Sequence, residues 1–170
     1  MATICQDSTN GTKSLCNGSY YGFYITYSDF PGSTITNIQF KLKGSNSYTL
    51  KAYAFKSDGT ALGQFGASKS ITLTSSYQTF EFSDSLVIES DTYFVFYNDP
   101  SGNYLCNGGN NEYAIHQNTT PTETRIKFVY KNYTTGSWTT DAAVYPNCCI
   151  TVAGGSGGVL LPPPYSEIVI

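Results

Sequence analysis

The chain is short of charge and of the residues that carry most chemistry. Only 12% of its 170 residues are charged, about half the usual share of a soluble domain, and it has one histidine, one tryptophan and one methionine. Nine Lys and Arg against twelve Asp and Glu give a net charge of −3, and the basic residues are dispersed. Counterion release from phosphates needs clustered cations, so we expect no nucleic-acid partner.

Motifs for catalysis and metal binding are also missing. The lone histidine, His116, has no Gly-x-Ser-x-Gly motif to work with, and no Cys-x-x-Cys pair supplies half of a zinc site. Acidic pairs such as Glu89 with Asp91 stand next to predicted turns, where carboxylates are usually solvated. The sequence therefore predicts a protein without enzymatic activity, metal or cofactor.

Long apolar runs are absent too. No stretch approaches the 18 or so apolar residues that a membrane span requires, and residues 1–20 lack the apolar, positively flanked core of a secretory signal. We expect neither a membrane partner nor a cleaved leader.

Five cysteines are present, which leaves at least one unpaired within the chain. The pairing that is easiest to form is Cys5 with Cys16, which closes a short polar loop. Adjacent Cys148 and Cys149 on a strand would point to opposite faces, so at most one faces the core. These features leave the redox compartment open.

What the sequence does contain is one short β-strand after another. Apolar and polar residues alternate over Ile38–Lys43, which places Ile38, Phe40 and Leu42 on one face. The same period of two recurs at 48–53, 71–74, 79–82 and 93–97, with turn residues rich in Gly, Asn and Asp between the runs. Because no helical period intervenes, we predict an all-β, antiparallel two-sheet β-sandwich of jelly-roll type, with roughly eight to ten strands and extended terminal arms.

Composition divides the chain into three segments. Residues 1–19 are polar and are expected to form an N-terminal arm, and residues 20–153 carry the strand signals of the sandwich. Residues 154–170 begin with a flexible Gly-rich linker and continue through three prolines, which favour an extended segment. The apolar residues of this tail are Val159, Leu160, Leu161, Tyr165, Ile168, Val169 and Ile170.

An apolar tail is costly to leave in water, because burial contributes about 1.5–3 kcal/mol per large side chain. Two interpretations remain open. The tail folds back as a strand of its own sandwich, or it adds a strand to a neighbouring subunit.

Aromatic residues supply the one candidate ligand platform. Tyr20, Tyr21 and Tyr24 cluster in a predicted strand, and Trp138 lies in a polar turn. Exposed rings of this kind can stack on sugar faces, while core packing is the alternative explanation.

The strand and turn pattern also carries a resemblance. Segments 33–43, 51–63, 73–82, 91–96 and 136–139 together resemble a widespread jelly-roll module. Such modules are similar to carbohydrate-binding sandwich domains, and they recur in structural proteins of phages and archaeal viruses, including fibres, tail parts and capsid decorations. The resemblance implies a non-enzymatic structural or binding role and assigns no ligand residue.

These observations lead to a first hypothesis and two alternatives. The first is a virion structural protein, located in the virion, that forms homo-oligomers or binds other virion subunits through its sandwich faces and C-terminal arm. The alternatives are a carbohydrate-binding module and a secreted, extracellular filament subunit joined by strand donation.

Overall fold

The computed structural model describes residues 1–6, 12–15, 19–44, 47–98, 113–118, 123–131, 136–141 and 145–154. These residues form fourteen β-strands and no helix. The strands are β1 (Ala2–Gln6), β2 (Thr12–Leu15), β3 (Tyr20–Ile25), β4 (Thr34–Gly44), β5 (Ser47–Lys56), β6 (Ala61–Gln64), β7 (Lys69–Thr72), β8 (Gln78–Val87), β9 (Thr92–Asn98), β10 (Tyr113–Asn118), β11 (Lys127–Lys131), β12 (Trp138–Asp141), β13 (Tyr145–Pro146) and β14 (Cys148–Ala153).

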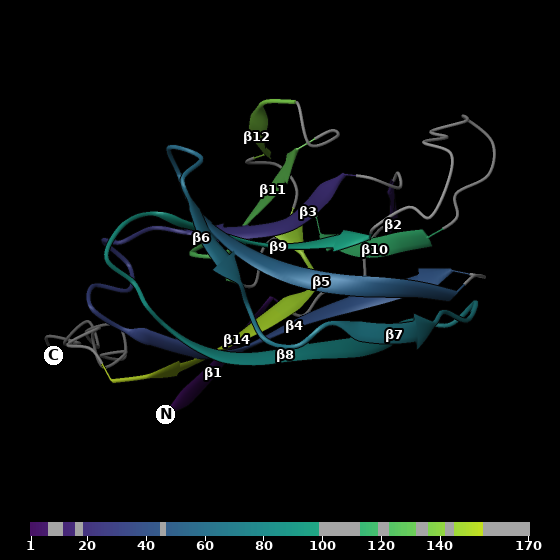
Figure 1. Ribbon diagram of the computed structural model, residues 1–170, viewed down its shortest axis with the longest axis horizontal. Coiled ribbons are helices and arrows are strands. Elements are labelled where there is room, and N and C mark those ends of the chain that lie inside the picture. Colours follow the sequence, from purple (N-terminus) through teal and green to yellow (C-terminus); the bar gives the residue numbers. More distant parts are fainter. Residues whose placement is uncertain are drawn as a thin grey trace, which may run out of the picture.

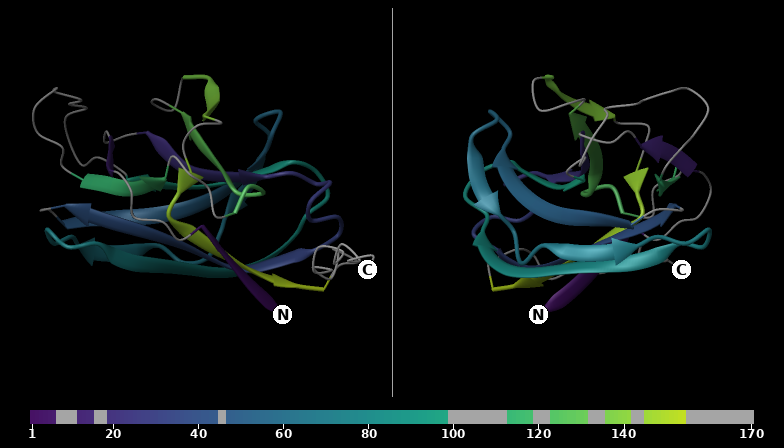
Figure 2. Two further views of the ribbon diagram at one scale, coloured as in Figure 1. Left: turned by 180° about the vertical axis from the view of Figure 1, so that it is seen from behind. Right: turned by 45° about the vertical axis from the view of Figure 1, so that its right-hand side comes forward.

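The strands form two antiparallel sheets that pack face to face, so the predicted sandwich is confirmed (Figure 1). The first sheet runs β1-β14-β4-β10-β13, with β8 on the other side of β4 and β2 beside β10. The second sheet runs β12-β11-β3-β9-β5-β6, with β7 also beside β5. From β3 to β5, and again from β8 to β11, each long strand lies in the opposite sheet to the one before it, as in a jelly roll. Figure 2 shows the two layers from other sides, with β11 and β12 projecting beyond the upper layer.

The core lies between the sheets and follows the predicted alternation. Ile38, Phe40 and Leu42 of β4 are fully buried, whereas the polar residues between them face outward. They meet inward-facing rings of the second sheet, and Phe40 lies 5.6 Å from Phe23 and 4.9 Å from Phe96 between ring centroids. Large apolar side chains from both layers therefore form one contiguous core.

The N-terminal residues are part of the sandwich, so the prediction of an arm over residues 1–19 is wrong where the structure describes them. Strand β1 pairs along its whole length with β14, and β2 pairs with β10. The apolar Ile4 packs against the main core, which a polar composition had obscured. An apolar anchor at Ile4, a row of backbone hydrogen bonds to β14 and the Cys5–Cys149 disulfide together hold this polar segment as an edge strand.

The disulfide also differs from the prediction. Cys5 is bonded to Cys149, not to Cys16, because β1 and β14 place Cys5 and Cys149 directly opposite one another with Cα atoms 4.1 Å apart. The expected opposition of Cys148 and Cys149 holds: Cys149 faces outward to its partner, and Cys148 is a buried free thiol. Burial raises the pKa of the Cys148 thiol well above its ordinary value, which keeps it protonated and inert. Cys16 and Cys106 lie outside the described residues.

The predicted C-terminal arm, with Val159, Leu160, Leu161, Tyr165, Ile168, Val169 and Ile170, lies outside the described residues. Within the described ranges, no helix is long and apolar enough to cross a membrane.

Candidate functional site

The outward side of the second sheet carries a cluster of aromatic side chains that is separate from the core. In β3, β5 and β9, one parity of the alternation points into the sandwich and the other points away from it, and large rings occupy both. We call the outward set the aromatic face: Tyr20, Tyr24, Tyr53, Phe55, Tyr93, Tyr97 and Trp138.

Strand register arranges this face in three rows that run across the sheet. One outer row reads Trp138, Lys131, Tyr20, Tyr97 and Lys51, from β12 to β5. The other outer row reads Lys127, Tyr24, Tyr93 and Phe55. Between them, the middle row reads Thr140, Val129, Gly22, Val95 and Tyr53. Large rings thus flank a central row whose middle members are small.

The centre of the middle row is glycine for a steric reason. A Cβ atom added to Gly22 would collide with the carbonyl oxygen of Phe94 and would lie 2.7 Å from the Cα of Val95. Because Phe94 and Val95 belong to the adjacent strand β9, only glycine lets β3 and β9 approach this closely.

Trp138 bridges the rows. It starts on β12, the edge strand, yet its ring centroid lies 5.0 Å from Phe55 and 5.1 Å from Tyr93, on β5 and β9. Tyr20 lies 5.8 Å from it. Strand β12 stands out above the layer in Figure 1. The ring contacts show that the indole of Trp138 extends from this edge strand back over β9 and β5. The contacts are tilted, a favourable arrangement for aromatic pairs.

Three of the four predicted platform residues lie together on this face: Tyr20, Tyr24 and Trp138, each half-buried. The inclusion of Tyr21 is wrong, since Tyr21 is only 3% exposed and packs in the core. Consecutive residues of a strand point to opposite sides, so Tyr20 and Tyr21 cannot serve one surface.

Sequence reasoning missed Tyr53, Phe55, Tyr93 and Tyr97. The signal was present, because Tyr53 and Phe55, like Tyr93 and Tyr97, share one parity of their strands. What could not be seen was that β5 and β9 lie beside β3, which is a matter of tertiary pairing.

Two tyrosines of the face, Tyr20 and Tyr93, have a raised pKa. Burial, and then the nearby Tyr53, raise the pKa of Tyr20 above its ordinary value. Burial, then Tyr24 and Asp91, do the same for the pKa of Tyr93, whose hydroxyl donates to the carbonyl oxygen of Ser57 at 3.3 Å. These groups are therefore neutral hydrogen-bonding partners across the physiological pH range.

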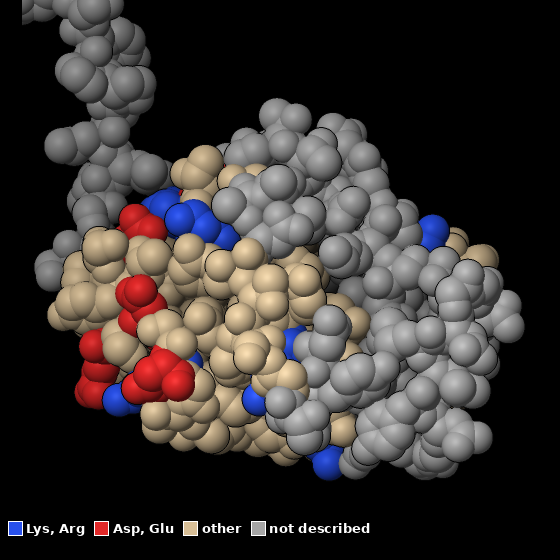
Figure 3. Space-filling view, turned by 90° about the horizontal axis from the view of Figure 1, so that it is seen from above, with Lys and Arg blue, Asp and Glu red and all other residues tan. Residues whose placement is uncertain are grey.

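Charge is distributed unevenly around the face. Seen from above, the Asp and Glu side chains gather toward one side, and Lys and Arg are scattered around an uncharged surface (Figure 3). Lys127 places its Nζ 5.4 Å from the ring centroid of Tyr24, and Lys131 places its Nζ 5.4 Å from that of Trp138. Both distances fall within the range of cation–π attraction.

Two aspartates hold the chain in place through hydrogen bonds to backbone N–H groups. Asp91 accepts a hydrogen bond from the backbone N–H of Tyr27 at 2.8 Å, and Asp84 accepts one from that of Gly66 at 3.0 Å. Glu89 lines a shallow depression of about 190 Å³ with Leu62 and Val87. Among the described residues, no group of three His, Cys, Asp or Glu side chains could hold a metal ion.

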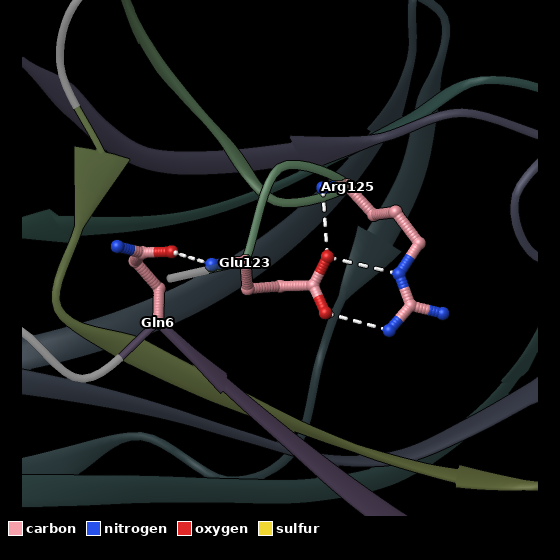
Figure 4. Close-up of polar contacts among 3 residues, drawn as sticks. All are labelled: Gln6, Glu123 and Arg125. Carbon is pink, nitrogen blue, oxygen red and sulfur yellow. Dashed lines mark hydrogen bonds and ion pairs between the residues drawn. The ribbon is translucent and has the colours of Figure 1, made fainter. Parts of the chain in front are cut away.

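A polar cluster links β1 to the segment that leads into β11 (Figure 4). The buried Gln6 accepts a hydrogen bond through Oε1 from the backbone N–H of Glu123 at 2.7 Å. Arg125 binds both carboxylate oxygens of Glu123, at 2.9 and 2.6 Å, which lowers the pKa of Glu123. This bidentate pair fixes the segment that leads into β11, and nothing in it suggests catalysis.

His116 lies on β10 with its backbone opposite Thr12, and its side chain is outside the described part of the structure. The aromatic face is therefore the candidate site. Comparisons with known proteins add nothing to this assignment, because no protein-family model matches the chain and no curated protein is similar to it.

Proposed function

We propose that this protein is a non-enzymatic binding module and that its aromatic face binds carbohydrate. The observation that carries the proposal is the gathering of seven aromatic side chains on the outward side of one sheet, beyond what the core requires. Tyr93 is buried, and the other six rings are half-buried and keep part of their surface exposed. Contiguous apolar surface of this kind can mark a binding site.

Carbohydrate fits this surface better than an apolar partner does. A sugar ring presents one apolar face and a rim of hydroxyls, and the aromatic face offers the same combination of flat rings and polar tips. Five of the seven rings are tyrosines, and four of them lie in outer rows that also contain lysines: Tyr20, Tyr24, Tyr93 and Tyr97. The hydroxyls of Tyr20 and Tyr24 and the lysine ammonium groups can bond to hydroxyls at the edge of a stacked sugar.

Trp138 provides the test, because it is the only tryptophan and it lies within the face. We expect its fluorescence to change on titration with a soluble polysaccharide from a panel of neutral and acidic polymers. Tyr24→Ala should weaken binding about tenfold or more, since one stacked ring contributes about 1–3 kcal/mol. Tyr27→Ala is the matched control, because Tyr27 is 44% exposed in a loop and does not belong to the face. Silence across the panel, together with a silent glycan array, would refute the proposal.

A structural subunit of a virion or extracellular filament is the second candidate. Two observations favour it. The edge strands β1 and β8 each have a single neighbour among the described residues, which leaves their outer edges available for strand addition. The Cys5–Cys149 disulfide is of the kind found on secreted proteins and virion surfaces.

The C-terminal segment tests this second candidate. We compare the full chain with a variant ending at Gly154 by light scattering and thermal unfolding. Conversion of oligomers to monomers with unchanged melting would assign the tail to assembly. Unchanged mass with a sharply lower melting temperature would assign it to the sandwich itself and would count against subunit exchange through the tail.

A further inference from the structure

The charged residues that share the outward side of the second sheet with the aromatic face are all positively charged. At the outward positions of β12, β11, β3, β9 and β5 that the structure describes, every charged side chain is a lysine: Lys51, Lys127 and Lys131. This bias is unexpected, because the chain as a whole has more acidic than basic residues. Two carboxylates near the face accept hydrogen bonds from backbone groups. Asp91, which precedes β9, accepts one from the N–H of Tyr27, and Asp58, next to Gly59 beside the Trp138 ring, accepts one from the N–H of Thr60.

Two of these lysines stand beside rings of the face. Within the described part of the chain, neither Lys127 nor Lys131 takes part in a salt bridge, and the contacts shown for them are with Tyr24 and Trp138. A cation–π contact leaves the outer hydrogens of an ammonium group free to donate. Each lysine therefore combines a positive donor with an adjacent flat ring.

The strand fixes the spacing of the backbone positions from which the two lysines extend. Lys127 and Lys131 are four residues apart on one strand and point to the same side, so their Cα atoms are separated by about 13 Å. Between them on β11 lies Val129, which is fully buried beneath the cluster. A chain of several sugar units lying along β11 could contact both.

From this arrangement, and resting on the carbohydrate-binding function proposed above, we infer that the face binds anionic polysaccharide. Lys127 and Lys131 would swing off the rings of Tyr24 and Trp138 to donate to carboxylate or sulfate groups, and the rings that they uncover would stack on the sugar. Charge-assisted hydrogen bonds are about twice as strong as neutral ones, so the lysines would select acidic over neutral chains.

Matched polymer pairs test the inference directly. Dextran sulfate is compared with dextran, and polygalacturonate with its methyl ester, using Trp138 fluorescence and calorimetry with the full chain. We expect the anionic member of at least one pair to bind about tenfold or more tightly than its neutral counterpart, and the difference to shrink at high salt.

A pair of double variants locates the charge effect. Lys127→Gln with Lys131→Gln should weaken anionic binding about tenfold or more. Lys41→Gln with Lys43→Gln removes the same charge from the outward side of β4 in the opposite sheet and should leave binding unchanged. Melting temperatures of both variants confirm that they fold.

The outcomes separate the two proposals. Equal binding of the neutral and anionic members, with no effect of Lys127→Gln and Lys131→Gln, would overturn the anionic preference and leave carbohydrate binding intact. Equal weakening by both double variants would also overturn it, because binding would then follow net charge. Failure of every polymer to bind would remove both proposals.

Discussion

The outward sides of the two sheets carry different kinds of side-chain contact between neighbouring strands. On the first sheet, short polar pairs bridge neighbouring strands: Asn37 bonds to Ser83 at 3.0 Å and Gln39 to Glu81 at 2.8 Å. The Cys5–Cys149 disulfide lies on this side as well. On the second sheet, aromatic contacts take the place of these polar pairs. Tyr20, for example, packs on both Tyr53 and Trp138.

This difference separates what the fold needs from what it does not. Cross-strand polar pairs contribute roughly 0.2–1 kcal/mol each and are enough to finish a solvent-facing sheet. Both sheets share the core between them, and the second sheet buries a further cluster of Tyr93, Val95 and Val129 on its outward side. We propose above that this additional cluster serves a ligand.

Removing the disulfide, which lies on the polar side, should have the largest effect. Because Cys5 and Cys149 are 144 residues apart, chain entropy predicts that Cys5→Ser with Cys149→Ser loses about 5 kcal/mol of the free energy of unfolding. Urea unfolding with and without reductant measures it, and the wild type should lose stability in reductant by about the amount that the double variant loses. A wild type insensitive to reductant would contradict the pairing.

Gly22→Ala, on the aromatic side, should cause the second-largest loss of the free energy of unfolding. The new Cβ would meet the backbone of Phe94, which cannot yield without separating β3 from β9, so we expect a loss of about 3 kcal/mol. Gly32→Ala is the control: its φ of +63° is unfavourable for alanine, but nothing lies within 4 Å, so the loss should be nearer 1 kcal/mol. Equal losses in the two variants would show that the close strand approach is unimportant.

Trp138→Ala should cost less stability than Gly22→Ala. Trp138 is half-buried and contacts three rings, so we expect a loss of about 2 kcal/mol, of which Trp138→Phe should restore roughly half. Thermal or urea unfolding monitored by circular dichroism measures both. If Trp138→Ala is neutral for stability but abolishes polysaccharide binding, the ring serves the ligand alone.

The Glu123–Arg125 pair should show the smallest effect, and one that depends on pH. Arg125 lowers the pKa of Glu123, so the pair stabilises the fold above the ordinary glutamate pKa of 4.5 and loses this contribution as the pH falls below it. Glu123→Gln should cost about 1 kcal/mol at pH 7, and its difference from the wild type should vanish at low pH. A difference that grows on acidification would contradict this sign.

Local pattern was sufficient for much of the fold. The alternation around Ile38, Phe40 and Leu42 placed these side chains in the core, and the turn residues between runs indicated antiparallel strands. The N-terminal strand was not predictable in this way, because Ile4 is the one apolar residue that packs from β1 against the core. Its place depends on β14, which lies at the far end of the sequence.

The candidate site was predictable only in part. The sequence does indicate part of the face. Aromatic residues are dense around Tyr20 and Tyr24, and Trp138 is the single tryptophan of the chain. Tyr53 and Phe55 gave no such signal, since rings at alternate positions of a strand are as compatible with a core as with an outward surface. Only the pairing of β5 with β9 shows on which side they lie.

Local sequence is enough to specify that this chain forms β-strands and which residues within each strand share a side. It also specifies that the strands build an antiparallel sandwich. Period-two alternation and turn residues are local, so they can be recognised along the chain. Tertiary structure decided which side became the core, which cysteines met, and that rings from β3, β5, β9 and β12 converge around Gly22. These contacts join residues far apart in sequence, and their geometry depends on strand order and register, which local preferences do not specify.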